Sequence, residues 1–316
     1  MNEPGSLIDI AGVLGGSLIT AALLIWVERR MLAFWQERLG PNRVGPFGIL
    51  QVVADMIKLF AKDEWVPPFA DRPVFVIAPT LLMLTTLLGL ALIPFAPGVG
   101  VVDLDFSLLA LLALISLSVY GPLLAGYASN SKYALLGGLR AAAQTFSYEV
   151  FMGLAAMGVV MQADSFGLRA IVDAQQHGWY IVPQCLGFVL FFIATVAESR
   201  RAPLDLAEAE QELVAGFHLE YSGIKFGMFF VGEYIGIVLN SALLVSLYLG
   251  GWWGPNFLPP LAWFLLKTAV FVGLFLLLRA SLPRPRYDQL MRFGWLGLLP
   301  LALLNLVLTA AWEVFL

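Results

Sequence analysis

Long apolar stretches recur along the whole of this 316-residue chain, separated by polar or Gly/Pro-rich connections. A helix needs about 20 apolar residues to cross the roughly 30 Å hydrocarbon core of a bilayer. Eight stretches approach or exceed that length, near residues 7–27, 74–96, 106–128, 138–161, 180–198, 228–250, 258–280 and 294–315. The pattern predicts an all-α, polytopic membrane protein in which residues 1–316 form a single integral-membrane domain with about eight transmembrane helices.

Composition argues against several other classes of protein. With 60% hydrophobic and 13% charged residues, the chain carries more apolar surface than one soluble core can bury. The net charge of −4 argues against a nucleic-acid partner, which requires a basic surface. The first residues lack the Lys/Arg-rich start of a cleaved signal, so the first apolar stretch is expected to be a retained helix.

The sequence carries no motif for a redox centre, a nucleotide or a metal. Its one cysteine, Cys185, excludes an internal disulfide and a Cys-ligated cluster. Its two histidines, His177 and His218, match no metal-ligand spacing, and there is no Walker loop, GxGxxG, CxxC or HExxH. We therefore expect no metal and no cofactor to be bound by this chain.

Lysine and arginine are concentrated in alternate connections. Sixteen of the 18 lie after the first, third, fifth and seventh stretches, whereas Arg169 lies in an opposite connection and Lys267 within a stretch. Because positive residues are retained on the cytoplasmic side, we expect both termini to lie on the other side of the membrane. The expected functional loops on the cytoplasmic side are residues 28–73, 129–138, 199–227 and 281–293.

The first of these loops contains a segment that is too short to span a membrane. Residues 47–62 are predicted to form an amphipathic helix, because their polar residues recur at i, i+4, i+7 and i+11. These residues are Gln51, Asp55, Lys58 and Lys62. Two interpretations stay open: an interfacial helix with an Asp55–Lys58 pair, or a narrow polar stripe that lines a cavity. The preceding turn carries Arg38 and Arg43, which can contact a lipid phosphate, a partner's carboxylate or a ligand carbonyl.

Ionisable residues within or at the ends of the apolar stretches form a second group. They are Glu28, Glu149, Glu198, Glu233 and Lys267. An ionised residue at the membrane centre costs about 2.5–3.5 kcal/mol on insertion scales, so it should face the bundle interior with a partner or a changed pKa. A static Glu–Lys pair is one explanation. A proton-conducting chain explains several carboxylates in one small bundle better, because each can take up and release a proton.

Acids are densest in the loop after the fifth stretch. They are Glu208, Glu210 and Glu212, followed further on by Glu220. A short helix is predicted over residues 206–216, with Asp205 as its N-cap and Glu208 completing a capping box. Capping does not explain the other acids. Carboxylates this close titrate as a coupled set, which suits them to taking up and passing on protons.

Nine segments, in this order, make the chain resemble the H subunit of the bacterial proton-pumping NADH:quinone oxidoreductase (respiratory complex I), in the family of mitochondrial NADH dehydrogenase subunit 1. The segments are 28–30 (ERR), 36–46 (QERLGPNRVGP), 54–59 (ADMIKL), 131–137 (SKYALLG), 140–144 (RAAAQ), 147–149 (SYE), 212–217 (ELVAGF), 279–284 (RASLPR) and 286–291 (RYDQLM). The resemblance covers nearly the whole chain.

The resemblance implies a bacterial inner-membrane subunit that joins the peripheral arm to the membrane arm and forms part of the ubiquinone chamber. It implies that Arg38, Arg43, Asp55 and Lys58 border the quinone chamber. It implies a proton path through Glu149, Glu198, Glu208, Glu210, Glu212 and Glu233, with Glu28, Glu220 and Lys267 as weaker members.

The implied partners are the peripheral-arm quinone-module subunits and adjacent small membrane subunits, and FMN and the iron–sulfur clusters belong to partner subunits.

Two alternatives stay open: the membrane subunit of a related energy-converting hydrogenase, and a stand-alone proton-coupled transporter. The complete motif at residues 36–46 favours the quinone enzyme. The chain shows no internal repeat, which argues against a transporter.

Overall fold

The computed structural model describes residues 7–207, 214–255 and 257–315, and within these ranges all regular structure is helical. Seven of the described helical segments are long and apolar enough to cross a membrane. They are α1 (Leu7–Trp35), α3 (Arg72–Ala91), α4 (Ser107–Ser118) continued by α5 (Tyr120–Ala128), α6 (Lys132–Ala163), α10 (Gly223–Tyr248), α11 (Pro260–Ser281), and α12 (Tyr287–Phe293) continued through a π-helical turn (Gly294–Leu298) into α13 (Leu299–Phe315). The prediction of an all-α, multi-pass membrane protein is confirmed.

The fifth predicted stretch, 180–198, differs in length from its prediction. Its helix, α8 (Cys185–Glu198), has only 14 residues, or about 21 Å at 1.5 Å per residue. The preceding residues form turns instead, because their polar groups are used elsewhere. The backbone amide of Ile181 donates a hydrogen bond to the Tyr248 carbonyl (2.9 Å), and the side-chain amide of Gln184 donates one to the Thr309 hydroxyl (2.7 Å).

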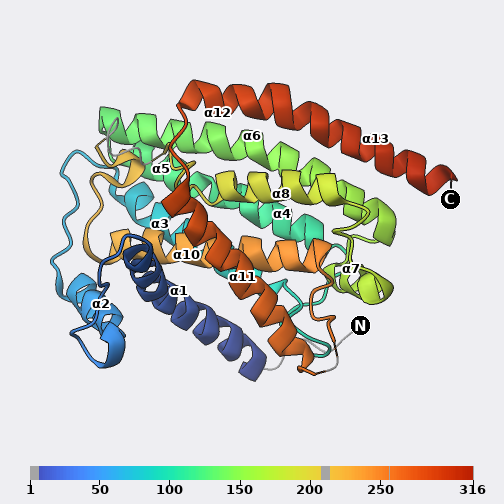
Figure 1. Cartoon of the computed structure of the whole chain (residues 1–316). Helices are drawn as coiled ribbons and strands as arrows, with labels where there is room; N and C mark the ends of the chain where they lie inside the picture. Colours follow the sequence, from blue (N-terminus) through green and yellow to red (C-terminus); the bar gives the residue numbers. More distant parts are fainter. Residues whose placement is uncertain (1–6, 208–213, 256, 316) are drawn as a thin grey trace.

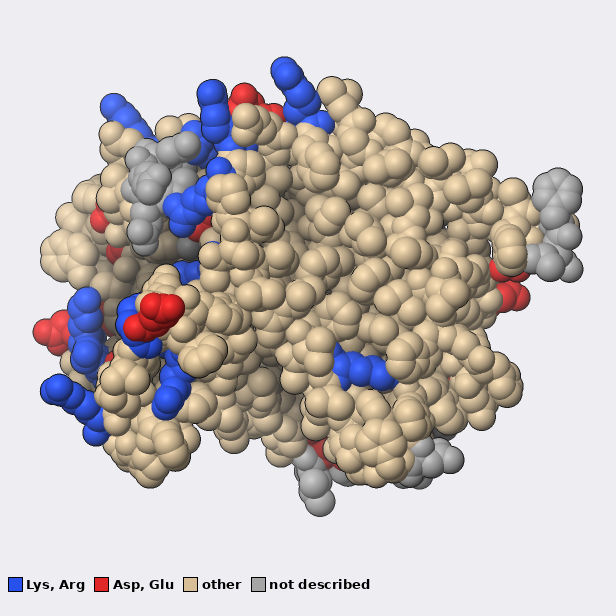
Figure 2. Space-filling model, in the orientation of Figure 1, with Lys and Arg blue, Asp and Glu red and all other residues tan. Residues whose placement is uncertain are grey.

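The helices form a bundle with α10 near its centre, where most residues of this helix are buried. In Figure 1, α12 and α13 cover α6 and α8 along one face, whereas α1 and α11 lie on the opposite face. Both ends of the described chain lie toward the end of the bundle that is opposite α2 (Gln51–Ala61). Figure 2 shows that lysine and arginine side chains gather at the α2 end.

The predicted amphipathic helix at residues 47–62 begins later than expected. A 3-10 turn at Pro46–Gly48 precedes α2, and the backbone of Gly48 has a φ of 76°. A side chain there would place its Cβ 2.1 Å from the carbonyl oxygen of Pro41. The turn therefore requires glycine, and it directs the chain from the arginine-rich segment into α2.

The remaining short elements connect the spans. These are α7 (Leu168–Ala174) and 3-10 turns at Gln175–His177 and Gly216–His218. Of the short helix predicted over 206–216, residues 208–213 lie outside the described residues, and the described residues on either side form turns.

The segment after the acid-dense loop is packed firmly against the bundle. A Cβ on Gly137 of α6 would lie 2.6 Å from the backbone nitrogen of Phe217, so only glycine permits this close approach. The ring of Tyr221 stacks on Phe75 of α3 with centroids 3.9 Å apart, and its hydroxyl donates to the Phe75 carbonyl (3.1 Å). These contacts attach the loop to α3 and α6.

Candidate functional site

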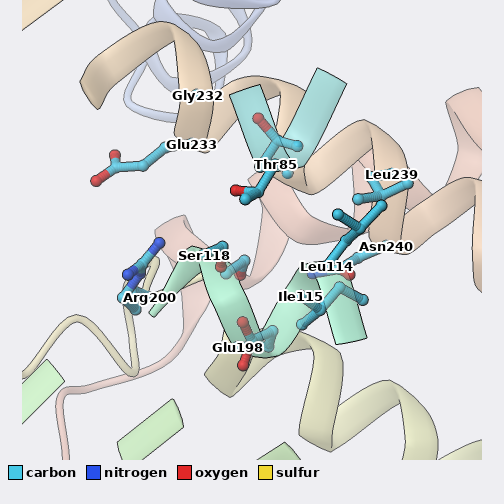
Figure 3. Close-up of a pocket in the computed structure, with 13 residues that line it drawn as sticks. Thr85, Leu114, Ile115, Ser118, Glu198, Arg200, Gly232, Glu233, Leu239 and Asn240 are labelled. Carbon is cyan, nitrogen blue, oxygen red and sulfur yellow. The ribbon is translucent and has the colours of Figure 1, made fainter. Parts of the chain in front are cut away.

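A small polar cavity lies among α3, α4, α10 and the residues that end and follow α8 (Figure 3). It is lined by Thr85, Thr86, Leu114, Ile115, Ser118, Glu198, Ser199, Arg200, Gly232, Glu233, Gly236, Leu239 and Asn240. The centres of water molecules can occupy about 30 Å³ of it, which is enough for one or two waters. Glu198 and Arg200 are each 5% exposed and Glu233 is 8% exposed. Buried charge in a membrane bundle is costly, which marks this cavity as a candidate functional site.

Glu198 is placed by the way α8 ends. It is the last residue of α8, and the chain then turns through Ser199 and Arg200. The side-chain amide of Gln144, on α6, donates hydrogen bonds to the carbonyl oxygens of Ala197 (2.8 Å) and Leu204 (2.7 Å). One buried amide thereby holds both sides of the segment that carries Glu198 and Arg200.

Glu233 reaches the cavity from α10, where small residues precede and follow it. A Cβ on Gly232 would lie 3.3 Å from the Leu82 side chain of α3, so glycine lets these two helices approach closely. Gly232 and Gly236 both line the cavity. These two glycines, four residues apart on α10, therefore also shape the space around Glu233.

Glu149 lies apart from this cavity. It is on α6, and it accepts a hydrogen bond from the hydroxyl of Ser116 on α4. The structure thus brings two of the four glutamates predicted within or at the ends of the apolar stretches, Glu198 and Glu233, to one cavity.

Glu28 has three hydrogen-bonding partners from other parts of the chain. The first helix continues past it to Trp35, so Glu28 lies inside α1 and is 3% exposed. Its carboxylate accepts hydrogen bonds from the guanidinium groups of Arg279 and Arg201 (3.5 Å for Arg201) and from the hydroxyl of Tyr234 (2.8 Å). The Arg201 guanidinium also lies over the Tyr234 ring, 4.2 Å from its centroid. Three partners compensate the burial of this charge.

The polar stripe of α2 meets α1 at Asp55. Its carboxylate pairs with Arg29 (2.6 Å) and accepts a hydrogen bond from Gln51 (2.9 Å). The ion pair that the structure gives Asp55 is therefore with Arg29 of α1, and not with Lys58 as in one of the two interpretations. Partial burial acts to raise the pKa of Asp55, but hydrogen bonds from Gln51 and Arg29 outweigh it, so this pKa lies below its ordinary value of 3.8. Asp55 is ionised throughout the neutral range.

The two arginines predicted for the quinone chamber lie in the exposed segment before α2. Arg38 donates to the side chain of Gln36 (2.8 Å), and Arg43 is exposed. Lys58 is also exposed, near the end of α2. Apolar side chains of α2, among them Ile57 (62% exposed) and Phe60 (70% exposed), point away from the bundle. An exposed apolar face of this kind is typical of a helix that lies at a membrane surface or against a partner.

Lys267 lies beside the end of α10 that is opposite α2. Its ammonium group donates to the carbonyl oxygens of Leu249 (2.6 Å), Gly251 (3.1 Å) and Trp253 (2.6 Å). Three donors are all that an ammonium group has, so these carbonyls satisfy it. The group also lies 4.4 Å from the centre of the Trp179 ring. These contacts stabilise the connection from α10 to α11.

Replacing Lys267 with methionine is expected to destabilise this connection by roughly 2 kcal/mol, because three charged hydrogen bonds are lost and water can replace part of them at the helix end. We expect the temperature at which the membrane-bound protein loses its native fold to fall in Lys267→Met. The exposed Lys132→Met change is the matched control. Equal thermal stability of the two variants would contradict a structural role for Lys267.

The acid-dense loop is described only at its edges. Asp205 pairs with Arg284, from the segment after α11, and is 6% exposed. Glu220 is half-buried beyond the Gly216–His218 turn. Glu208, Glu210 and Glu212 lie outside the described residues. Among the described residues, no group of three or more His, Cys, Asp or Glu is arranged to hold a metal ion.

Several residues of these sites were not singled out from the sequence. They are Arg200 in the cavity, Ser116 beside Glu149, Gln144 beneath the turn, and Arg201, Arg279 and Tyr234 around Glu28. Their positions give no local signal, since Glu28 and Arg279 are 251 residues apart. The excess of arginine in the cytoplasmic-side connections pointed toward the arginines, and Gln144 and Arg279 lie in segments that carry the family resemblance (140–144 and 279–284).

Two comparisons relate this chain to known proteins. The sequence model of the NADH dehydrogenase family matches residues 8–310. The H subunit of NADH-quinone oxidoreductase from Methylococcus capsulatus is 67% identical to it over 307 residues, which is 97% of this chain and 97% of that protein. The resemblance found in the sequence motifs is confirmed. The chain belongs to the NADH dehydrogenase family, together with the H subunit of NADH-quinone oxidoreductase.

Proposed function

We propose that this chain is the membrane subunit of a NADH:quinone oxidoreductase that forms part of the quinone chamber and couples quinone reduction to proton translocation. The observation that carries the proposal is the cavity in which Glu198 and Glu233 lie buried between spanning helices. Carboxylates in a water-excluding bundle can take up and release protons when waters connect them. The full-length relation to the Methylococcus protein supports the choice of enzyme.

The proposed proton path uses the acids of the bundle and of the loop beside it. Its members are Glu149, Glu198, Glu208, Glu210, Glu212 and Glu233, with Glu28, Glu220 and Lys267 as weaker candidates. The shared cavity supports a step between Glu198 and Glu233. Glu198 joins that cavity to the acid-dense loop, because the turn after α8 leads directly into the loop.

The proposed quinone chamber lies beside α1 and α2, bordered by Arg38, Arg43, Asp55 and Lys58. The chain supplies binding groups there, and the electrons come from an iron–sulfur cluster in a partner subunit, with FMN in another. Peripheral-arm subunits would cover the α2 end of the bundle, and small membrane subunits would flank it. We place the chain in a bacterial inner membrane, with α2 on the cytoplasmic side and both termini on the periplasmic side.

Charge reversal at Asp55 tests the chamber. In Asp55→Lys, the attraction between the α2 carboxylate and Arg29 (2.6 Å in the structure) becomes a repulsion. We expect the concentration of a quinone-site inhibitor that halves NADH:quinone reduction to change by about fivefold or more. The exposed Asp63→Lys variant is the control. If Asp55→Lys shows the inhibitor titration of the unmodified enzyme, Asp55 does not border the chamber.

Purification of the tagged chain in mild detergent tests the function as a whole. We expect it to bring iron–sulfur subunits with it and to show inhibitor-sensitive NADH:quinone reduction. Hydrogenase activity in the purified material would indicate the related energy-converting assembly instead. A chain that purifies alone, intact and without NADH:quinone reduction would overturn the proposal in favour of a transporter.

A further inference from the structure

Arg200 occupies an unusual place beside the acids of the cavity. It comes two residues after Glu198, is 5% exposed and lines the cavity with Glu198 and Glu233 (Figure 3). Its backbone has a φ of 51°, in the left-handed region. That region costs a residue with a side chain about 1 kcal/mol or more, and such strain persists where the surroundings impose it and is concentrated at functional sites.

Two nitrogens of the buried Arg200 guanidinium have no hydrogen-bond partner among the described residues. Within the described structure, its Nε and Nη1 make no hydrogen bond, and neither does Oε2 of Glu198. The hydroxyls of Thr85, Thr86 and Ser199 donate to backbone carbonyls of their own helices, so toward the cavity they offer acceptors. A water molecule fits the space and can accept from Arg200 while donating to Glu198.

Burial alone does not explain why Arg200 lacks a direct ion pair, because the neighbouring residue, Arg201, has one. Arg201 turns to Glu28, with which it forms an ion pair. Arg200 turns instead to a cavity with two glutamates and makes no direct ion pair with either among the described contacts. Two successive buried arginines thus serve different carboxylate groups.

Arg200 carries the charge opposite to that of the Glu198 carboxylate. Glu233 lines the cavity from α10, and Glu149 lies outside it on α6; an acid near another acid disfavours its ionised form. The lining residues from α3 and α4 are uncharged: Thr85, Thr86, Leu114, Ile115 and Ser118. Among the described residues, Arg200 is the cation that lines the cavity.

We propose that Arg200 is a positioning residue for proton transfer: its fixed charge, acting across the cavity, favours the ionised form of Glu198 and so lets Glu198 exchange protons near neutral pH. This inference rests on the proposed function and deepens it. In this proposal, the charge of Arg200 sets the pH range in which the carboxylates of the cavity take up and release protons.

The test is the pH profile of inhibitor-sensitive NADH:quinone reduction in the assembled complex, normalised to NADH:ferricyanide activity. In Arg200→Gln and in Arg200→Met, Glu198 should hold its proton more tightly, so the acidic limb of the profile should move to higher pH by about one unit or more. Arg200→Lys keeps the charge and should leave the limb within about half a unit of its original place. Arg169→Gln, whose arginine pairs with Asp103 at a distant connection, is the matched control.

The outcomes separate this inference from the proposed function. An unmoved acidic limb in both neutral variants, or an equal movement in Arg200→Lys, would overturn the role of Arg200. If only one neutral variant assembles, that variant decides. Were Glu198→Gln to keep full quinone reduction and pumping, the proton-path proposal would fail first, whatever the Arg200 variants show.

Discussion

Glu198→Gln in the assembled enzyme complex is expected to lower inhibitor-sensitive NADH:quinone reduction by about tenfold or more, because a positioned proton-exchanging group typically contributes at least that much. Glutamine has nearly the same shape and can keep the hydrogen bonds of the cavity, but it cannot take up and release a proton. NADH:ferricyanide activity should persist, since it needs no proton to pass through this chain. Both activities are measured in membranes that contain equal amounts of complex.

The matched control is Glu313→Gln, which neutralises an exposed acid near the end of α13. Its quinone reduction should equal that of the unmodified enzyme. Glu149→Gln should resemble Glu198→Gln, although Glu149 does not line the cavity. Undiminished quinone reduction and proton pumping in Glu198→Gln would remove Glu198 from the path.

The largest effect on stability is expected from Glu28→Gln. This change leaves the guanidinium groups of Arg279 and Arg201 facing each other without the buried carboxylate that now accepts hydrogen bonds from both. Removing one partner from a buried ionic group typically costs about 3–5 kcal/mol. We expect much less assembled protein in the membrane and a lower temperature for loss of quinone reductase activity.

Two variants make this test specific. Asp63→Asn neutralises an exposed acid and should change the stability by less than about 0.5 kcal/mol. Glu28→Met combined with Arg279→Met replaces one ion pair with apolar side chains and should recover part of the loss. A Glu28→Gln variant as stable as Asp63→Asn would show that the carboxylate is not needed to compensate the two arginines.

The membrane-spanning helices could be predicted because hydrophobic length in a bilayer is a local property of the sequence. The prediction was wrong about the length of the fifth stretch, since its first residues make contacts to α10 and α13 that apolarity does not reveal. Ile181 bonds to Tyr248, and Gln184 bonds to Thr309. A helix in an apolar stretch can therefore be shorter than the stretch when polar groups in it form hydrogen bonds with residues far away in the sequence.

The sequence identifies the acids of the candidate site, but it does not show which of them lie together in the fold. A glutamate within an apolar stretch is conspicuous, so Glu149, Glu198 and Glu233 stand out from hydropathy alone. Which of them share a cavity depends on how α8 and α10 face one another. One of the two interpretations of α2 paired Asp55 with Lys58, whereas Arg29 of α1 forms its ion pair. Pairing between helices is decided by packing, which periodicity does not encode.

The double hydrogen bond of Gln144 has a practical consequence for mutagenesis. This residue does not line the cavity, yet its amide joins the two segments of chain that flank Glu198 and Arg200. A library of variants restricted to cavity-lining positions would therefore omit Gln144, which holds the two segments beside Glu198 and Arg200 together. Screens for altered proton coupling should include α6, where one substitution can change the spacing of two charges without altering either of them.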